Sequence, residues 1–175
     1  MALANLTIPT VSPEYAERLN RRSLSEHQEM WAILDSVYDP ELPAVTIWDL
    51  GILHDITWTS DGWLVEITLT YSGCPAVGVI KEDIELAFKQ ANINDSITID
   101  VILAPAWTTE FISPSGKQQL KSINIAPPVN EDETIHCPLC DSENTVVISE
   151  FGSTSCKALY RCKDCLEPFD YFKPF

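Results

Sequence analysis

The sequence predicts a mixed α/β (α+β) domain followed by a small β module, and three observations lead to this fold class. Apolar residues between positions 24 and 123 recur with helical or alternating spacing, in the order helix, strand, strand, helix, strand, helix. A polar, proline-bearing segment follows at 126–133. The last part of the chain carries two Cys-x-x-Cys pairs. We therefore expect an N-terminal arm at 1–23, a first domain at 24–128 and a small module at 133–175.

Helix-start signals open the chain. Ser12-Pro13 is typical of a helix N-terminus and starts a short helix of thin apolar content, which we place within the N-terminal arm. Ser25 and Gln28 form a capping box before a second helix. Asp39-Pro40 ends that helix, because the residue before a proline avoids the helical region. Residues 41–51 carry few regular signals and are expected to form a loop.

Alternating and helical patterns then predict the rest of the first domain. Ser60-Asp61-Gly62 is a hairpin turn signal between two alternating segments. The helix after Cys74-Pro75 carries an apolar stripe, and Ser113 is the cap of a last short helix. The expected bounds are 52–59, 63–70 and 96–103 for the strands, and about 91 and 123 for the helix ends.

The chain is strongly acidic, and this bounds its partners. Its net charge is −15, and residues 24–132 carry most of the excess. A protein that binds DNA or RNA needs a basic face to displace counterions, so we expect no nucleic acid and no anionic membrane among its partners. No apolar run approaches the roughly 20 residues of a spanning helix. Residues 1–23 lack the pattern of a secretory signal, and we therefore expect a cytoplasmic protein.

Four cysteines of the C-terminal module form two knuckle sequences. They are Cys137 with Cys140 and Cys162 with Cys165. Two knuckles on adjacent hairpins supply the four thiolates of a tetrahedral metal site. Because a module of about 40 residues has too small a core to fold alone, the metal would supply much of its folding free energy. Structural zinc is the expected ion, and iron in a rubredoxin-like site is the alternative with the same ligands.

Four neighbours of these cysteines bear on the geometry. Asp141 and Leu166 stand where metal ribbons often carry glycine, and Leu tolerates a left-handed backbone less readily than Asp. Cys156 is a fifth cysteine, and it is open whether it is an alternative ligand, a redox thiol or a packed side chain. His136 adjoins the first knuckle, and we expect it to be solvated because four thiolates are available.

Cys74 is the cysteine of the first domain. It lies between Gly73 and Pro75 at the predicted start of a helix, where the helix dipole favours a thiolate. Gly73 would allow close approach of a partner or ligand. On the residues alone, a reactive role and a structural role for Cys74 both stay open.

Four separated motifs follow one another in the first domain: Tyr38-Asp39-Pro40-Glu41, Asp49-Leu50-Gly51, Thr68-x-Thr70 and Gly73-Cys74-Pro75. Together they resemble the metal–sulfur cluster assembly factor family, also called the iron–sulfur assembly P domain, over residues 24–128. The resemblance implies that fold and a part in iron–sulfur cluster assembly or transfer. It also implies that Cys74 handles a transient cluster, with Asp39 and Glu41 nearby. A helix-terminating turn is the alternative role for the two carboxylates.

Further motifs extend the resemblance through the ribbon: Ile125-Ala126-Pro127-Pro128, Glu150-Phe151-Gly152-Ser153-Thr154 and the run from Cys156 to Cys162. With the four cysteines they resemble the PaaD (PaaJ) family of phenylacetyl-CoA epoxidase subunits over nearly the whole chain. The resemblance implies an accessory role in aerobic phenylacetate breakdown, by assembling an iron–sulfur or iron centre in a partner. The implied partners are the other epoxidase subunits, above all the iron–sulfur and flavin reductase.

Three functions compete at this point. The first is an accessory assembly factor with no catalytic activity of its own. The second is a permanent structural or electron-transfer subunit of the oxygenase complex that docks through the ribbon. The third is an enzyme with Cys74 as nucleophile, and it is the least supported, since the sequence shows no phosphate loop, flavin fingerprint or recognisable catalytic triad.

Overall fold

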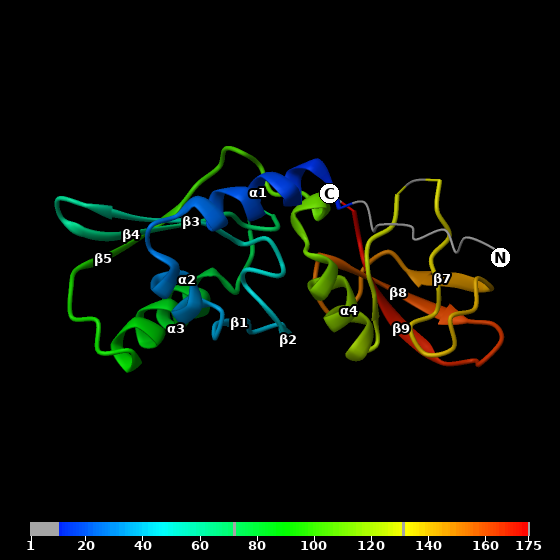
Figure 1. The fold of residues 1–175 in the computed structure, drawn as a ribbon. Helices are drawn as coiled ribbons and strands as arrows, with labels where there is room; N and C mark the ends of the chain where they lie inside the picture. The colour runs from blue at the N-terminus through cyan, green and yellow to red at the C-terminus, as the bar shows by residue number, and fades with distance from the viewer. Residues whose placement is uncertain (1–10, 72, 131, 175) are drawn as a thin grey trace, which may run out of the picture.

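The computed structural model describes residues 11–71, 73–130 and 132–174. These residues form two units arranged end to end, seen on the left and right of Figure 1. We call residues 13–122, from α1 to α4, the first unit, and residues 133–174 the ribbon. The predicted fold class, a mixed α/β unit followed by a small β unit, is confirmed.

Helix α1 (Pro13–Leu24) packs along the first unit. Ser12 caps it by accepting a hydrogen bond from the backbone N of Tyr15 (3.3 Å). Arg18 of this helix is buried, and its guanidinium donates to three backbone carbonyls, those of Phe111, Trp48 (2.9 Å) and Leu53 (3.1 Å). Residues 13–24 are thus packed on the first unit, whereas we placed most of them in an arm because they carry few apolar residues. Residues 1–10 of that arm lie outside the described part of the chain.

Helix α2 (Gln28–Leu34) begins later than its capping signal suggested. His27 is its N-cap, and the Ser25 hydroxyl instead accepts from the backbone N of His27 (3.2 Å) in a turn between the two helices. The Gln28 side chain donates to the carbonyls of Arg22 and Ser25. The capping-box residues therefore hold the bend between α1 and α2, and do not cap α2.

A two-stranded antiparallel sheet replaces the expected loop after Asp39-Pro40. Strands β1 (Tyr38–Asp39) and β2 (Leu42–Thr46) pair with Asp39 opposite Leu42. Residues 45–48 are all buried in succession. Because this burial does not alternate, the sequence carries no strand signal here.

The central sheet of the first unit has the strand order β3-β4-β5. Its strands are β3 (Leu53–Thr59), β4 (Gly62–Ile67) and β5 (Ile97–Val101), as the alternating pattern predicted within a few residues. β4 and β5 run parallel, so helix α3 (Val77–Gln90) is the crossover between them. α2 and α3 lie side by side along the sheet (Figure 1). The core contains large side chains that are fully buried, among them Trp31, Leu34, Ile56, Ile67, Ile80 and Phe88.

Helix α4 (Pro114–Ser122) lies between the sheet unit and the ribbon. It follows the short turn η1 (Thr109–Phe111) and is capped as expected, since Ser113 Oγ accepts from the backbone N of Gly116 (2.8 Å). Strand β6 (Ile125–Ala126) comes directly after it and carries the chain into the ribbon.

The ribbon is built on a four-stranded sheet with the order β6-β9-β8-β7. β7 (Thr145–Ser149) and β8 (Lys157–Cys162) contain the apolar run Val146-Val147-Ile148 and the run that leads into the second knuckle. β9 (Pro168–Phe172), which like β6 was not predicted, pairs antiparallel with β8 on one side and parallel with β6 on the other. The segment that leaves the first unit is therefore itself part of the ribbon sheet.

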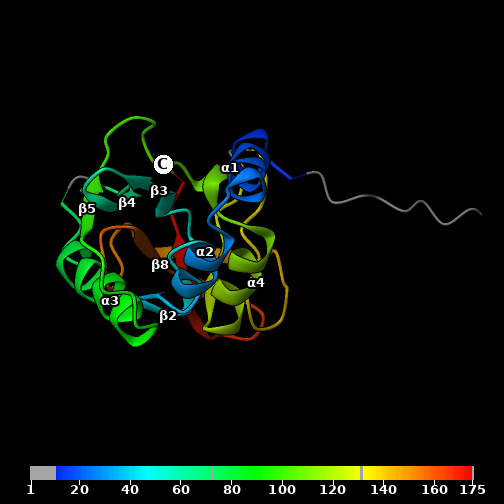
Figure 2. The same ribbon diagram turned by 60° about the vertical axis from the view of Figure 1, so that its left-hand side comes forward.

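The two units share a packed junction, although the polar, proline-bearing segment at 126–133 is of the composition typical of a linker. The Trp107 ring of the first unit lies 6.0 Å from the Phe172 ring at the end of β9. Phe172 and Cys156 are both buried within the hydrophobic core of the first unit. Figure 2, in which the first unit comes forward, shows the ribbon strands directly behind it.

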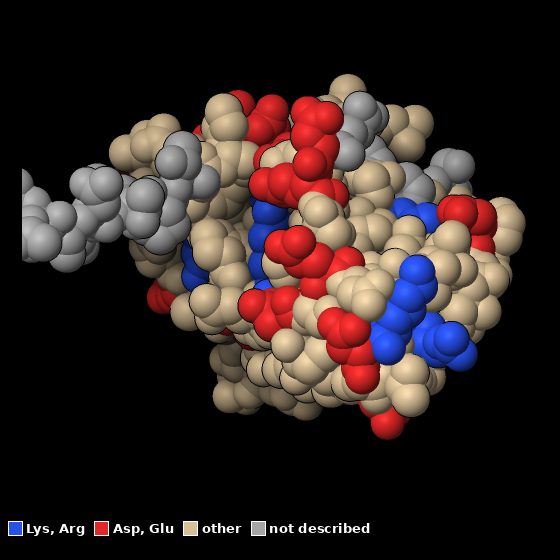
Figure 3. Space-filling model, turned by 90° about the vertical axis from the view of Figure 1, so that its right-hand side faces the viewer, with Lys and Arg blue, Asp and Glu red and all other residues tan. Residues whose placement is uncertain are grey.

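Acidic side chains are prominent on the ribbon end of the molecule. Figure 3 shows Asp and Glu side chains in a band across this face, with smaller groups of Lys and Arg beside it. Among the described residues, no helix combines the length and the apolar character needed to cross a membrane.

Candidate functional site

The two cysteine knuckles of the ribbon have closely similar backbone geometry. In the first knuckle, Asp141 donates from its backbone N to the carbonyl of Cys137 (2.9 Å) and has a left-handed φ of 59°. In the second, Leu166 has a φ of 66°, and the backbone N of Cys162 donates to the carbonyl of Glu167 (3.0 Å). Leu166 thus adopts the conformation that glycine accepts at no steric cost. The second knuckle forms despite a leucine there, at some cost in backbone strain.

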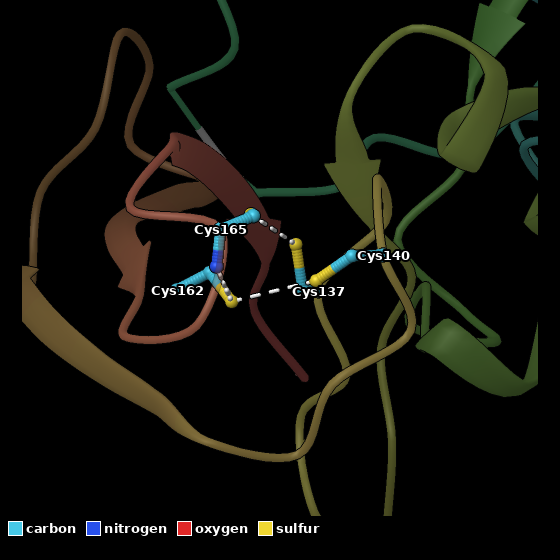
Figure 4. Close-up of side chains that lie close together, drawn as sticks. All are labelled: Cys137, Cys140, Cys162 and Cys165. Atoms are coloured by element: carbon cyan, nitrogen blue, oxygen red, sulfur yellow. Dashed lines mark hydrogen bonds between the residues drawn. The ribbon is translucent and has the colours of Figure 1, made fainter.

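The four ribbon sulfurs lie in one compact group, facing one another from the two knuckles (Figure 4). Cys137 Sγ is 3.7 Å from Cys165 Sγ, and Cys140 Sγ is 3.6 Å from Cys162 Sγ. Zinc–sulfur bonds of about 2.3 Å at tetrahedral angles place the sulfurs about 3.8 Å apart. The spacing therefore fits a closed four-thiolate metal site.

Polar contacts around this centre join one knuckle to the other. The Asp164 carboxylate accepts from Ser142 Oγ (2.5 Å) and from Asn144 Nδ2 (2.9 Å), and these hydrogen bonds hold the pKa of Asp164 below its usual range. The backbone N of Cys165 donates toward Cys162 Sγ (3.5 Å) and is the main cause that lowers the pKa of Cys162, whereas burial and hydrogen bonds within the same group raise the pKa of Cys140.

His136 and Cys156 do not belong to the group of four sulfurs. The His136 ring lies near Asp141, with Nδ1 3.2 Å from the carbonyl oxygen of that residue. Cys156 precedes β8, whereas the knuckle cysteine Cys162 ends it. A strand of six residues spans about 20 Å, so Cys156 lies at the opposite end of β8 from the ribbon centre.

Cys74 lies before helix α3 and not at its cap, contrary to our expectation. The helix begins at Val77, with Ala76 as N-cap, and the Cys74 backbone N donates to the carbonyl of Tyr71 (3.2 Å). Burial raises the pKa of the Cys74 thiol, against the opposing effect of a hydrogen bond from the backbone N of Ala76. Free Cys74 is therefore held as a thiol, and the thiolate that we expected from the helix dipole is disfavoured.

The two carboxylates of the Asp-Pro-Glu motif act electrostatically on Cys74. The charges of Asp39 and Glu41 both add to the rise in the pKa of the Cys74 thiol. Asp39 is itself buried, and burial is the main cause that raises the pKa of its carboxyl group. Its Oδ1 accepts from the backbone N of Glu41 (2.8 Å), which fixes the carboxylate in the β1–β2 turn. Asp39 and Glu41 thus both form the β1–β2 turn and act electrostatically on the Cys74 thiol.

Cys156 joins this cluster from the ribbon. Its Sγ lies 3.0 Å from Thr154 Oγ1, and its pKa is raised, chiefly by burial and also by the charge of Glu41. Cys156 adds in turn to the rise in the pKa of Cys74. Two thiols and two carboxyl groups from separate parts of the chain therefore influence one another electrostatically near the junction of the two units. We call Asp39, Glu41, Cys74 and Cys156 the junction cluster.

Sequence reasoning missed two further members of this neighbourhood. Tyr71 lies close enough to Cys74 and Cys156 that both raise the pKa of its phenol, after the larger effect of its burial. Lys157 is a buried cation that acts electrostatically on Asp39, and its Nζ lies 3.9 Å from Asp170 Oδ2. Tyr71 lies three residues before Cys74, and Lys157 directly follows Cys156. No sequence motif distinguishes a tyrosine or a lysine in such a position, so the sequence analysis could not identify them.

Family models match both parts of the chain. Residues 27–101 match a family described as "Iron-sulfur cluster assembly protein", and residues 126–173 match the "PaaD zinc beta ribbon domain". A solved structure of a domain of unknown function (DUF59) from Bacillus anthracis is similar, with 27% identity and a TM-score of 0.49, over 60% of this chain and 95% of that one.

Two curated proteins are similar in sequence. A Porphyromonas gingivalis protein named as an Fe-S protein maturation auxiliary factor is 30% identical over 103 residues, which are 58% of this chain and 97% of the relative. An Escherichia coli protein that is provisionally named as a component of 1,2-phenylacetyl-CoA epoxidase is 42% identical over 166 residues, which cover 90% of this chain and 98% of the relative. By that match over nearly the whole of both chains, together with its two family domains, the chain belongs to the PaaD family of 1,2-phenylacetyl-CoA epoxidase components.

Proposed function

We propose that this chain is an accessory component of a phenylacetyl-CoA epoxidase system, in which it assists the assembly of an iron–sulfur or iron centre in a partner protein. The observation that supports the proposal is that the carboxylates of Asp39 and Glu41 act electrostatically on the buried Cys74 thiol, in a domain of the iron–sulfur assembly type. Iron ions in proteins are bound by thiolates and by carboxylates, and Cys74 with Asp39 and Glu41 offers both ligand types. The similarity to an Fe-S maturation factor supports the same role.

The ribbon serves this function as a structural metal site that holds zinc. The four sulfurs of the group face one another at the spacing of a closed four-thiolate site, so an ion held there would have no position left open for substrate or cargo. Cargo iron would therefore be handled at Cys74. The iron–sulfur and flavin reductase of the epoxidase system is the recipient that we propose, because its centre contains the type of cluster that this family assembles.

The proposal is tested first in cells. In a strain that depends on this protein for growth on phenylacetate, Cys74→Ser should abolish that growth while the protein stays at normal abundance. Reductase purified from this strain should contain little iron and acid-labile sulfide. Cys74→Ser growing like the parent would refute cluster handling by Cys74. A matched control is Ser153→Ala, an exposed change in the loop before Cys156, which should leave growth and the iron content of the reductase unchanged.

A second experiment separates an assembly factor from a permanent component. Oxygenase and fully assembled reductase are purified from the parent strain and assayed with and without this chain. An assembly factor is dispensable once the partner holds its centre, so activity should be the same in both assays. A strict requirement for this chain in stoichiometric amount would instead identify it as a structural or electron-transfer component.

A further inference from the structure

We propose that a groove between helix α3 and the β1–β2 turn is the docking site for a basic segment of the partner protein, which inserts one arginine side chain there. The identity of that partner as the reductase rests on the proposed function, whereas the chemistry of the groove does not. The groove lies at the bottom of the first unit in the view of Figure 1 and has a volume of about 350 Å³. This is near the lower limit of about 300 Å³ for ligand pockets, a size that suits one long side chain.

The walls of the groove are apolar and partly uncovered. Tyr38 and Leu86 are each 48% exposed, although both are large apolar side chains. Pro40 and Pro43 line the side that is formed by the β1–β2 turn. The ring of a proline fixes its backbone φ, so this side of the groove is largely formed before a partner arrives. A partner with an aliphatic stem can therefore cover apolar surface here at little cost in ordering the turn.

Helix α3 contributes one of its faces to the groove. Asp83, Leu86 and Gln90 all line it, and their spacing of three and four residues places them on the same side of the helix. A different stripe of α3, which includes Ile80 and Ile84, is fully buried in the core of the first unit. The groove face of α3 therefore has an apolar residue between two polar ones, which suits a ligand that is itself amphipathic.

The charged groups of the groove have one sign. Asp39 and Asp83 line it, and none of the described residues that line it is a Lys or an Arg. The Asp83 side chain makes no hydrogen bond or ion pair with another described residue, and neither does the side chain of Gln90. A carboxylate on partly apolar surroundings is attracted most strongly to a cation that can approach it directly. In a chain of net charge −15, this groove therefore favours a basic partner.

An arginine side chain matches these features better than a lysine. Its planar guanidinium can donate two parallel hydrogen bonds to the Asp83 carboxylate, and it can also stack on the ring of Tyr38. Its aliphatic stem can lie along Leu86 and the two prolines while its charged end stays at the carboxylate. One side chain thus satisfies both the apolar walls and the unpaired acid.

The position of the groove connects docking with the proposed function. Tyr38, Asp39 and Pro40 line the groove and belong to the same motif as Glu41. The carboxylates of Asp39 and Glu41 act electrostatically on the Cys74 thiol. A partner that docks in the groove is therefore held against the turn that carries these two carboxylates.

The simplest alternative is that Tyr38 and Leu86 are ordinary surface residues. Single exposed apolar side chains are common on soluble proteins and need no partner. These two, however, border the same hollow as an unpaired carboxylate, an arrangement that a surface without a ligand does not require. A second copy of this chain could also cover the groove, and the experiment below separates that occupant from the reductase.

The test measures the Kd of the full-length, zinc-filled chain for purified reductase from which the iron–sulfur cluster has been removed, by calorimetry at low and high KCl. Asp83→Asn keeps the shape of the side chain and removes its charge. It should raise the Kd by about 10-fold or more and make binding less sensitive to salt. Glu85→Gln is the matched control, since Glu85 is an exposed carboxylate of the same helix that does not line the groove, and it should change the Kd by less than about 3-fold.

Leu86→Ala tests the apolar wall in the same assay. It should raise the Kd by about 5-fold or more, because the arginine stem loses apolar surface that it covers. Its matched control is Leu19→Ala, since Leu19 is a leucine of α1 that is 46% exposed and does not line the groove, and this variant should bind like the wild type. Circular dichroism and zinc content report whether each variant is folded.

The proposal is overturned if the wild-type chain does not bind the cluster-free reductase, or if folded Asp83→Asn or folded Leu86→Ala binds it as tightly as the wild type does. It is also overturned if these variants abolish only self-association of the chain in sedimentation, because the occupant is then a second copy. Failure of the groove variants to weaken binding, in a strain whose growth still requires Cys74, leaves the proposed function standing. Growth without Cys74 refutes the proposed function and does not alter the binding result, so the two failures are distinguishable.

Discussion

Leu166 is a single residue at which the ribbon stores backbone strain. Its φ of 66° is left-handed, which costs an L-residue other than Gly about 1–2 kcal/mol, and its side chain is 67% exposed. We expect Leu166→Gly to raise the stability of the metal-loaded ribbon by about 1 kcal/mol. The measurement is the thermal midpoint, or the chelator concentration that removes the metal.

Leu139 provides the matched control for this change. It is a similarly exposed leucine within the first knuckle and is not among the residues with positive φ. Leu139→Gly relieves no strain and adds freedom to the unfolded chain, so it should lower stability by about 0.5–1 kcal/mol. If both glycines act in the same direction, strain at Leu166 is not the cause.

The burial of the Asp39 carboxyl group lowers the stability of the folded protein at neutral pH. Because burial raises the pKa of its carboxyl group, the folded protein keeps a proton that the unfolded chain has already lost. The free energy of unfolding should therefore fall as pH rises from the ordinary Asp value through the raised folded-state pKa. We expect Asp39→Asn to remove this decline and to melt at a higher temperature than the wild type at pH 7, while growth on phenylacetate is impaired.

Asp35→Asn is the control for Asp39→Asn. Asp35 is half exposed and pairs with Arg22 (2.6 Å), so its neutralisation removes an attraction and relieves no burial penalty. We expect a loss of at most about 1 kcal/mol. A melting temperature for Asp39→Asn at pH 7 no higher than that of the wild type would contradict the assignment of Asp39 as a destabilising group.

At the scale of elements, the packing of α1 on the rest of the first unit depends on the guanidinium group of Arg18. Arg18 lies 4.2 Å from the Trp48 ring centroid and donates to three backbone carbonyls inside the first unit. Arg18→Ala should cost at least about 3 kcal/mol, because the carbonyls lose their partners and the side chain leaves a cavity. Arg21→Ala, in the next turn, removes a partly exposed side chain and should cost about 1 kcal/mol or less. Urea unfolding monitored by circular dichroism measures both.

Local pattern explains which elements could be predicted. The β3–β4 hairpin, α3 and β5 have regular periods and clear turn signals, and they form close to the expected residues. β2 ends in consecutive buried residues, while β1 and β6 are each two residues long and exist through their pairing with β2 and β9. These strands form through tertiary contacts, so the hydrophobic periodicity of the sequence cannot predict them.

The same distinction applies to the candidate site. The four ribbon cysteines follow from spacing, and Cys74, Asp39 and Glu41 follow from resemblance to an assembly family. The burial of Cys156 in the same core as Cys74 depends on how Phe172, at the end of β9, packs near Trp107, which no local pattern encodes. Burial also reversed the expected ionisation of Cys74, since desolvation outweighs the hydrogen bond from the backbone N of Ala76 there.

At the scale of the molecule, the junction couples the stability of the two units. Cys137→Ser removes a metal ligand, and we expect the first unit to lose stability together with the ribbon, because Phe172 and Cys156 are part of its core. All five tryptophans precede the ribbon, so tryptophan emission reports the first unit. Its thermal midpoint should fall by several degrees in Cys137→Ser and in chelated wild type. An unchanged midpoint in both would mean that the units unfold independently.

The central place of β9 in the ribbon sheet has a consequence during protein synthesis. Ile125 and Ala126 of β6 leave the ribosome well before residues 168–172, with which they must pair. Until β9 emerges, the nascent chain has an unpaired strand edge at β6, and Trp107 lacks the Phe172 ring beside it. The first unit therefore cannot be completed in the order in which it is translated, and the growing chain passes through a stage with an unpaired strand edge and uncovered apolar surface, the features that make folding intermediates prone to aggregation.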